Sequence, residues 1–289
     1  MKPIGVVFVC MMLILSGAGF TTALENDTIY VDDDGTADYI SIQEAIDAAD
    51  EGDTVFVYGG TYNENLQIDK TISMIGEEKN NTIICGLGHG NVVNITADSV
   101  SMQGFFVRDG IQSEAGIFVH DAMDVSIAEC KIAFNQGIGI ELDLTKNVIV
   151  SNCIIASNEQ FGIVVYTSDG SHVCSTDNLI LCCDISMNKW GVFLDDIKEC
   201  TVKNNVISFN DEYGIHLAFA QDCEIRQNNF IYNKIDAFFQ GRYQNVWSQN
   251  FWAKSPHLSF RIIPGKIIFI PWFNVDRNPL GTPNRTGGY

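Results

Sequence analysis

Hydrophobic and polar residues alternate in short runs along most of the chain, and from Gly116 onward the runs recur as a repeat. Ile117 with Val119, and Val125 with Ile127, are apolar residues two positions apart, which is the period of a β-strand. Each repeat has room for three such strands. The repeats begin 23, 23, 29, 23 and 23 residues apart, at Gly116-Ile-Phe-Val, Gly139-Ile-Glu-Leu, Gly162-Ile-Val-Val, Gly191-Val-Phe-Leu, Gly214-Ile-His-Leu and Ala237-Phe-Phe-Gln.

An asparagine recurs near the end of each repeat, at Asn135, Asn158, Asn188, Asn210 and Asn233. A period in the twenties, with strands, no intervening helix, and Gly or Asn at the bends, is typical of a solenoid in which each repeat forms one coil. The pattern therefore predicts an all-β, single-stranded parallel β-helix with three short strands per coil. Neighbouring coils would pair about 4.8 Å apart, and parallel crossovers make a right-handed helix the expectation.

One segment ahead of the repeats has a helical pattern instead. Ser41 is a suitable N-cap, Glu44 completes a capping box, and Gly52 is a stop signal, so residues 41–52 are predicted to form an amphipathic helix. Such a helix would cover the open end of the first coil. We expect a signal peptide at 1–23, an N-terminal cap at 24–53, the β-helix at 54–252, and a C-terminal cap and tail at 253–289.

Four short stretches resemble a known superfamily. They are Ile42-Gln-Glu-Ala-Ile, Gly52-Asp-Thr-Val, Gly60-Thr-Tyr-Asn-Glu and Lys70-Thr-Ile-Ser-Met-Ile-Gly76, which look like the opening of the pectate-lyase-like right-handed β-helix proteins. With the repeats behind them, residues 28–275 are similar to exported repeat proteins of the carbohydrate-binding/sugar-hydrolysis and NosD-type periplasmic copper-binding group. This resemblance implies the fold. It leaves the chemistry open, because the group ranges from lyases and hydrolases to adhesins and maturation factors.

The net charge and the N-terminal residues indicate which partners the protein can have and where it is located. The chain has 17 basic and 36 acidic residues, a formal charge of −19, which argues against nucleic acid as a partner because that affinity rests on Lys and Arg. Lys2, the apolar run from Val6 to Leu15 and the small residues ending at Ala23 have the layout of a secretory signal. We expect an extracellular, cell-surface or periplasmic protein with no stable membrane anchor beyond that signal. An uncleaved anchor is the alternative.

Cysteines in the exported part of the chain are even in number, which invites a disulfide interpretation. The repeat register favours another one for most of them. Cys130, Cys153 and Cys183 fall at one position of three successive coils, and Cys200 and Cys223 continue the column begun by Val125 and Val148, so we expect stacked core thiols. Cys174 and Cys182, at opposite ends of an insertion spanning Thr167 to Asp177, are the better candidate pair.

Outward positions of the Gly-Ile-x-Leu strand form two columns that combine aromatic rings with carboxylates. Sugar rings stack on aromatic planes and their hydroxyls bind carboxylates, so the columns predict a saccharide-binding surface, although polar residues also alternate along any exposed strand. The predicted substrate-binding residues are Phe118, His120, Glu141, Tyr166, Phe193, His216 and Phe239; Val164, Asp143, Asp195, Ala218 and Gly241 complete the columns, and Asp196 lies just beyond.

Catalysis is predicted to involve Asp143, Asp195 and Asp196. The first two are two coils apart, or about 10 Å between backbones, near the upper limit for the carboxyls of an inverting glycosidase. The hydrolase pattern of the superfamily is not reproduced: Asp195-Asp196 is present, but Gly88-His89-Gly90 comes too early and is predicted to be a turn. The lyase combination of calcium-binding acids beside an Arg base is absent too; Arg108, Arg226 and Arg242 are isolated.

No cofactor is predicted, and calcium or copper lacks a clear ligand set. Copper would call for Met, Cys or clustered His ligands, whereas the five His are scattered; His172 with Cys174 and Cys182 comes nearest to a cluster. The leading hypothesis is an exported protein that binds a polysaccharide or cell-surface glycan, with hydrolase or lyase activity left open. The alternatives are a non-catalytic structural or adhesive envelope protein and a NosD-like periplasmic metal-handling factor.

Overall fold

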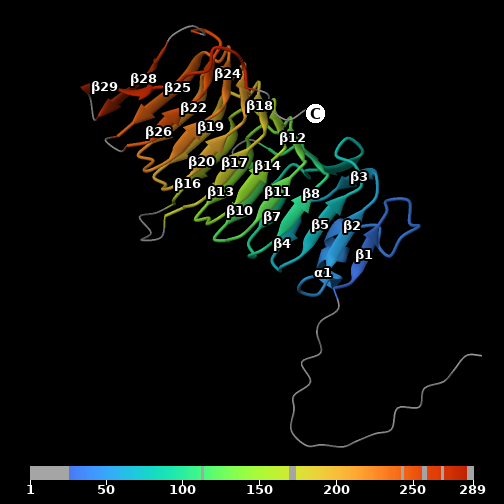
Figure 1. Ribbon diagram of the computed structural model, residues 1–289. Helices are drawn as coiled ribbons and strands as arrows, with labels where there is room; N and C mark the ends of the chain where they lie inside the picture. The colour runs from blue at the N-terminus through green and yellow to red at the C-terminus, as the bar shows by residue number, and fades with distance from the viewer. Residues whose placement is uncertain are drawn as a thin grey trace, which may run out of the picture.

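The computed structural model describes residues 26–111, 114–168, 174–241, 244–255, 259–267 and 270–284. They form a right-handed parallel β-helix whose coils stack from the N-terminal to the C-terminal end of the molecule (Figure 1). Each coil contributes one strand to each of three sheets, named here A, B and C in the order in which the chain visits them. The predicted fold class is confirmed.

Within each sheet the strands follow one another one coil at a time. Sheet A contains β1 (Thr28–Val31), β2 (Thr54–Val57), β5 (Ser73–Gly76), β8 (Ser101–Gln103), β11 (Ser126–Ala128), β14 (Ile149–Ser151), β17 (Leu179–Leu181), β20 (Thr201–Lys203), β23 (Glu224–Arg226) and β26 (Val246–Ser248). Sheet B contains β3 (Gly60–Asn63), β6 (Thr82–Cys85), β9 (Phe106–Arg108), β12 (Lys131–Ala133), β15 (Ile154–Ala156), β18 (Asp184–Ser186), β21 (Val206–Ser208), β24 (Asn229–Ile231) and β27 (Phe251–Trp252). Sheet C contains β4 (Leu66–Ile68), β7 (Val93–Ile95), β10 (Ala115–His120), β13 (Ile138–Asp143), β16 (Phe161–Tyr166), β19 (Trp190–Asp195), β22 (Tyr213–Ala218), β25 (Ile235–Gln240), β28 (Arg261–Ile267) and β29 (Ile270–Asp276).

The interior is a stack of side chains from all three sheets. Aliphatic residues at the inward positions, such as Ile140, Ile163 and Val192, have no exposed area. The repeated asparagines form a second kind of column. From Asn158 through Asn233, the side-chain oxygen of each accepts from the backbone N–H and the side-chain nitrogen of the asparagine one coil earlier, and Asn135 accepts from the backbone N–H of Gly110. The bends therefore satisfy their buried polar groups by stacking, which ties each coil to the next.

Glycines occupy the second position of most long strands of sheet C because the next coil passes too close for a side chain. A Cβ built on Gly162 would lie 2.6 Å from the carbonyl oxygen of Gly191 and 2.8 Å from the Asn188 side chain. The recurring glycine of one coil thus leaves room for the recurring asparagine side chain of the next coil.

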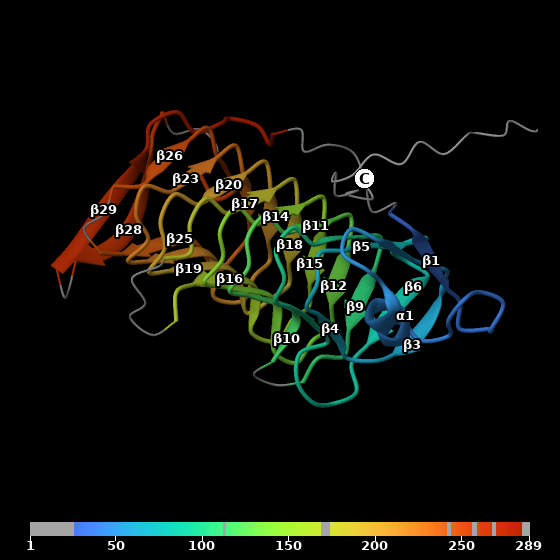
Figure 2. The same cartoon turned by 90° about the horizontal axis from the view of Figure 1, so that it is seen from below.

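The helix α1 (Ile42–Ala48) closes the N-terminal end (Figure 2). Its buried face, Ile42, Ala45 and Ile46, joins the core. Ser41 is the N-cap, as predicted, and the carboxylate of Glu64 accepts from the N–H groups of the first turn at 2.9 Å. The helix ends four residues before the predicted Gly52.

The early end of α1 has a physical cause in the neighbouring coil. The Lys70 ammonium donates to the carbonyls of Asp47 (3.1 Å) and Ala49 (2.9 Å), so the last carbonyls find a tertiary partner. Gly52, at φ +95°, belongs to the turn that leads into β2 instead.

At the C-terminal end, β28 pairs in parallel with β25 and then in an antiparallel hairpin with β29. Asp276, at the end of β29, is fully buried. Its Oδ2 accepts from the backbone N (3.1 Å) and Nδ2 (3.0 Å) of Asn250 and from the indole nitrogen of Trp252 (3.2 Å). The hairpin is thereby fixed to the last coil.

The last repeat is displaced by one residue from its predicted alignment. Ile215 pairs with Ala237 and Leu217 with Phe239, so Asp236 occupies the place of the repeated glycine and the final step is 22 residues. Phe239 therefore faces inward and is 2% exposed. The prediction that Phe239 belongs to an outward column is wrong, and Phe238 and Gln240 end the two columns.

The cysteine columns are confirmed as core. Cys130, Cys153, Cys183, Cys200 and Cys223 are buried thiols, although Asn178 interrupts the second column. Burial raises the pKa of Cys130 and of Cys153 well above the usual thiol value. Cys174 carries a free thiol, so its predicted pairing with Cys182 is not formed.

Candidate functional site

The outer face of sheet C carries both predicted columns. In register from β10 to β25, the first column runs Phe118, Glu141, Val164, Phe193, His216 and Phe238, and the second runs His120, Asp143, Tyr166, Asp195, Ala218 and Gln240. Apart from the final positions, this is the predicted order. Asp143 and Asp195 lie two coils apart, as expected from the repeat.

A third outward column was not predicted from the sequence. It consists of the residues just before each glycine position, and in three successive coils these are Phe161, Trp190 and Tyr213. The signal was present in the sequence as an aromatic residue directly ahead of three consecutive repeat glycines. Its meaning depended on the long strands of sheet C starting one residue before the glycine.

Together the columns form a continuous group of rings, which we call the aromatic platform: Phe161, Trp190, Phe193, Tyr213, His216 and Phe238. Phe161 stacks on Phe193 at 5.5 Å between centroids and an interplanar angle of 19°. Trp190 contacts Phe161 at 5.3 Å and Tyr213 at 4.8 Å. Aromatic rings on the outside of a solenoid, rather than in its core, form a surface able to stack on a flat apolar ligand face.

His216 lies in the middle of the aromatic platform. Its ring is 5.2 Å from Trp190, 5.3 Å from Phe193 and 5.0 Å from Tyr213. Only 9% of the residue is exposed, and within the described part of the chain neither ring nitrogen has a hydrogen-bond partner. Burial, with a smaller effect of the Lys266 charge, lowers the pKa of His216 to about 4. At neutral pH its ring is uncharged and still able to accept a hydrogen bond.

A polar cluster adjoins the platform on β10, β13 and β16. The Tyr166 hydroxyl donates to Glu141 Oε1 at 2.8 Å, and His120 Nδ1 lies 3.1 Å from Asp143 Oδ2. Asp143 also accepts from the Ser168 backbone N at 2.9 Å and is 3% exposed. Asp143 is therefore placed to hold His120 rather than to touch a ligand.

Burial is the main cause of the raised pKa values at this cluster, and neighbouring negative charges add to it. Burial raises the pKa of Glu141, and the charges of Asp143 and Glu114 add to the rise despite the Tyr166 hydrogen bond. Burial and the hydrogen bond to Glu141 raise the pKa of Tyr166, so its hydroxyl stays protonated. Burial, and then the charge of exposed Asp196, raise the pKa of Asp195.

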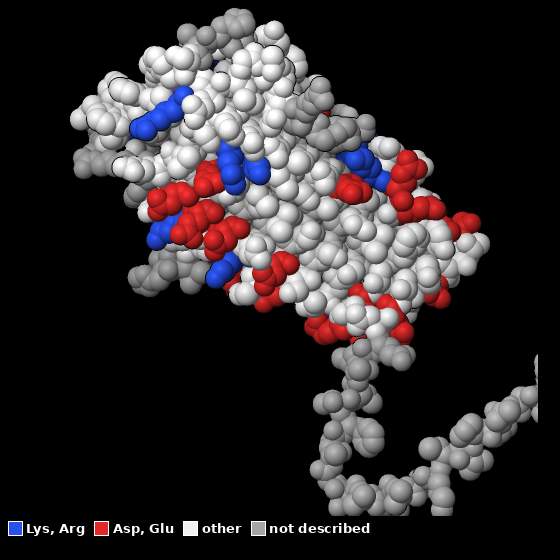
Figure 3. Space-filling model, viewed as in Figure 1, with Lys and Arg blue, Asp and Glu red and all other residues white. Residues whose placement is uncertain are grey.

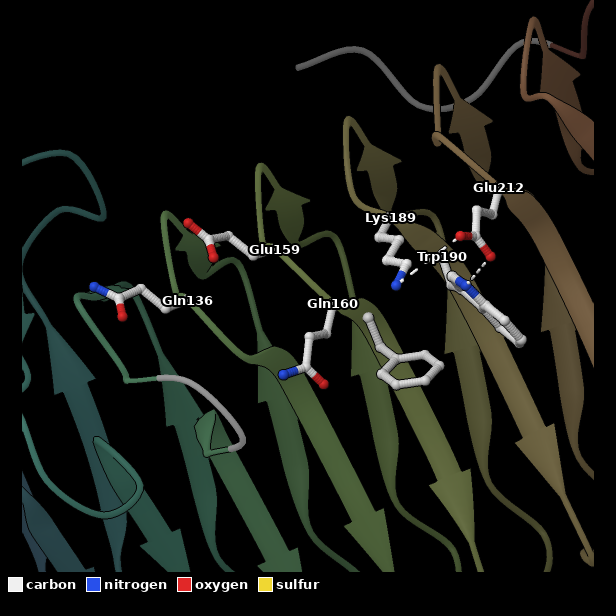
Figure 4. A pocket seen from close by; sticks show the side chains of 7 residues that line it. Gln136, Glu159, Gln160, Lys189, Trp190 and Glu212 are labelled. Carbon is white, nitrogen blue, oxygen red and sulfur yellow. Dashed lines mark hydrogen bonds and ion pairs between the residues drawn. The ribbon is translucent and has the colours of Figure 1, made fainter.

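A pocket of about 420 Å³ opens beside the platform where the chain turns from sheet B into sheet C. Its lining includes Phe161, Trp190, Glu159 and Glu212, with Lys189 above (Figure 4). The Trp190 indole nitrogen donates to Glu212 Oε2 at 2.8 Å, and Lys189 Nζ lies 3.9 Å from Glu212 Oε1. The indole ring is thus held in place by its polar edge.

The inserted segment after β16 adds its two described ends to this face. The Thr167 hydroxyl donates to the Asp196 carbonyl at 2.8 Å, and the Ser175 hydroxyl donates to the Tyr166 carbonyl at 2.6 Å. Residues 169–173, and with them His172, lie outside the described residues, as do Arg242, His257 and the predicted signal peptide. Gly88 and Gly90, at φ +77° and +65°, bracket His89 in a bend, in line with the predicted turn.

The donor atoms needed for a metal do not gather in the described part of the chain. No three His, Cys, Asp or Glu side chains there are arranged to hold an ion. Copper favours thiolate, thioether and imidazole ligands, whereas the stacked thiols are buried and hard to deprotonate. These residues do not fit a copper site. No described helix is long and apolar enough to cross a bilayer.

Comparison with solved structures supports the fold. An alginate lyase from Paenibacillus sp. str. FPU-7 is 18% identical with a TM-score of 0.60, covering 78% of this chain and 86% of that one. A rhamnogalacturonan lyase is 15% identical with a TM-score of 0.63, covering 78% and 74%. A pectin methylesterase from carrot is 14% identical with a TM-score of 0.56, covering 83% and 88%.

Sequence comparison gives a family. No curated protein matches the chain. A family model described as periplasmic copper-binding protein (NosD) matches residues 46–257, nearly all of the coils. This chain therefore belongs to the NosD family of β-helix proteins.

Proposed function

We propose that this chain is an exported carbohydrate-binding protein that holds a polysaccharide against the outer face of sheet C. The observation that carries the proposal is the aromatic platform with the Glu141–Tyr166 and His120–Asp143 pairs beside it. Rings stack on the C–H faces of sugars, and the flanking carboxylates and hydroxyl bind sugar hydroxyls. Lyases and an esterase of polysaccharides share the fold, which supports a carbohydrate-related role.

Export is part of the same proposal. The N-terminal sequence has the layout of a secretory signal, and the description of the family places its members in the periplasm. We propose a periplasmic or extracellular location, at or near the cell surface.

The binding surface is tested by removing one ring. Trp190→Ala should weaken retention by a polysaccharide about tenfold or more, because stacked aromatic anchors dominate such interfaces. Retardation in native gels that contain different polysaccharides, followed by calorimetric titration with the polymer that binds, measures this. Tyr30→Ala is the matched control, since Tyr30 is 41% exposed on β1 of sheet A, at the N-terminal end of the solenoid. Equal binding by both variants would contradict the proposal.

Cleavage of the bound polysaccharide is a separate question at the same surface. His120 is held by the Asp143 carboxylate and is partly exposed, so it is placed to move protons, whereas Tyr166 stays protonated and holds Glu141. Asp195 and Asp196 remain the candidate carboxylates, while Asp143 orients His120. Release of reducing ends or unsaturated products by the wild type, and its loss in an Asp143→Ala/Asp195→Ala double variant, would support an enzyme. Binding without turnover would support an adhesive or structural protein.

Metal handling is the second candidate, and the description of the family is what favours it. If the protein handles metal, the purified full-length chain should take up Cu(I) in stoichiometric amount, as measured by competition with a colorimetric chelator. Because the described side chains do not form a metal cluster, we expect no uptake above that of a chain whose cysteines have been alkylated after unfolding.

A further inference from the structure

The charges around the aromatic platform are unbalanced. Carboxylates border it on both sides: Glu141 in the first column, Asp143 and Asp195 in the second, Asp196 just beyond, and Glu114, Glu159 and Glu212 along the turns. Figure 3 shows that acidic side chains also gather near the edges of the molecule in that view, around a broad uncharged area. A ligand that reaches the platform therefore passes between negative charges.

In the described part of the chain, few cationic side chains that could pair with a negatively charged ligand lie beside the aromatic platform. Lys189 is the basic residue of the pocket, and its ammonium is 3.9 Å from Glu212. His216, in the centre of the platform, is uncharged at neutral pH because burial lowers its pKa to about 4. Lys266, on β28, borders the C-terminal end of the platform.

We infer that this surface selects polysaccharides that carry no carboxylates, and that it prefers protonated amino sugars to neutral sugars. The inference rests on the proposed function and narrows its substrate class. An ammonium group beside Glu141 would offset its repulsion by Asp143 and Glu114, and one beside Asp195 would offset its repulsion by Asp196, at partly buried positions where screening is weak. A uronate would add a further negative charge to the same positions.

His216 provides an independent observation for the same class of ligand. Both of its ring nitrogens are nine-tenths buried and without a partner in the described chain. Within the aromatic platform an uncharged imidazole accepts a hydrogen bond from a sugar hydroxyl or an ammonium. The neutral ring has one donor and one acceptor nitrogen. A ligand ammonium or hydroxyl can donate to the acceptor nitrogen, whereas a carboxylate can meet only the donor nitrogen.

Three β-linked oligosaccharides of equal length test the inference, made of glucose, glucosamine and mannuronate. Calorimetric titration of the full chain at mildly acidic pH and low salt should give the tightest binding for glucosamine, roughly tenfold weaker binding for glucose, and at least another tenfold loss for mannuronate. Added salt should reduce the differences in affinity between the three oligosaccharides, because salt screens the interactions between charges. Glu141→Gln should narrow the gap between glucosamine and glucose. Glu129→Gln, the same change at an exposed turn between sheets A and B, should not.

The outcomes separate this inference from the proposed function. Binding of mannuronate as tightly as glucose, or no preference for glucosamine over glucose, overturns the inference and leaves a carbohydrate-binding protein. Failure of all three oligosaccharides, and of every polysaccharide tested in gels, overturns the proposed function and the inference with it.

Discussion

At the scale of single residues, His216 shows how the outer face departs from an ordinary polar surface. A histidine on an exposed strand would normally be hydrated, but here rings from β19, β22 and β25 enclose it. Because a charged imidazole is costly in that surrounding, the folded protein resists its protonation, and burial lowers the pKa of His216 to about 4. The unfolded chain therefore binds this proton at a higher pH than the folded protein does.

This difference in pKa predicts a dependence of stability on pH. Between the ordinary value of 6.5 and about 4, only the unfolded state binds the His216 proton, so stability should fall as the pH drops through this window. His216→Phe should remove this contribution. Between pH 7 and pH 4 the free energy of unfolding of the wild type should therefore fall by about 3 kcal/mol more than that of the variant. Urea unfolding at a series of pH values, followed by circular dichroism, measures it.

Tyr213→Phe is the matched control for that series, because it alters the same aromatic platform without removing a group that titrates in the window. Its pH profile should parallel that of the wild type. Parallel profiles for the wild type and His216→Phe would show that the folded and unfolded states bind this proton equally.

At the scale of elements, the asparagine column determines how coils join at the bend before sheet C. Asn188 is fully buried; its Oδ1 accepts from the backbone N and Nδ2 of Asn158, both at 3.0 Å, and its Nδ2 donates to the Ile155 carbonyl at 3.0 Å. Each amide thus serves two coils. The 29-residue step that contains the insertion keeps this column intact, since Asn188 remains in line between Asn158 and Asn210.

Loss of one amide from the column should be costly. Asn188→Ala leaves two buried donors of Asn158 without their acceptor, and we expect the free energy of unfolding to fall by about 3 kcal/mol or more. Urea unfolding at neutral pH measures this. Gln103→Ala, which truncates an exposed amide at the end of β8, should change stability by less than about 0.5 kcal/mol. A similar small effect at Asn188 would mean that water replaces the amide.

At the scale of the whole molecule, stability is a sum over neighbouring coils, because each coil contacts mainly the coils before and after it. The ends are then the weak points, and both are covered: α1 packs on the first coil and the β28–β29 hairpin on the last. Asp276 is central to the second cover, since one carboxylate oxygen holds both Asn250 and Trp252.

Asp276→Ala should therefore loosen the C-terminal coil alone. Backbone amides of β26 and β27 should lose about 2 kcal/mol of protection from hydrogen exchange, or roughly thirtyfold. Amides of β11 and β12 should keep theirs, because fraying in a solenoid starts at the end. Mass spectrometry of exchanged peptides resolves the two regions. Arg277→Ala, at the exposed neighbouring residue, is the control; uniform loss of protection would instead show that the coils unfold as one unit.

The solenoid, its three strands per coil and its inward columns could all be predicted from the amino-acid pattern alone. These follow from local facts: a period of two within strands, a small residue where coils approach closely, and an asparagine wherever a bend must satisfy buried backbone groups. A Cβ at Gly162 would meet the next coil at 2.6 Å, so the glycines and the fold imply each other. The two outward columns were predictable for the same reason, and with them the polar cluster and the platform residues Phe193 and His216. The other four platform residues, Phe161, Trp190, Tyr213 and Phe238, were not predicted.

Which outward residues contact one another, and how deeply each is buried, depends on how the coils stack. The turn after Asn233 reaches the glycine position in three residues, where the turn after Asn210 takes four, and this slip of one residue moved Phe239 into the core and Phe238 onto the surface. Such a slip reverses every side chain of a strand. The contact of Trp190 with Phe161 and Tyr213, the burial of Asp143 and the enclosure of His216 likewise join residues from different coils. A pattern along one coil specifies where a side chain points, but its neighbours come from the coils stacked on either side.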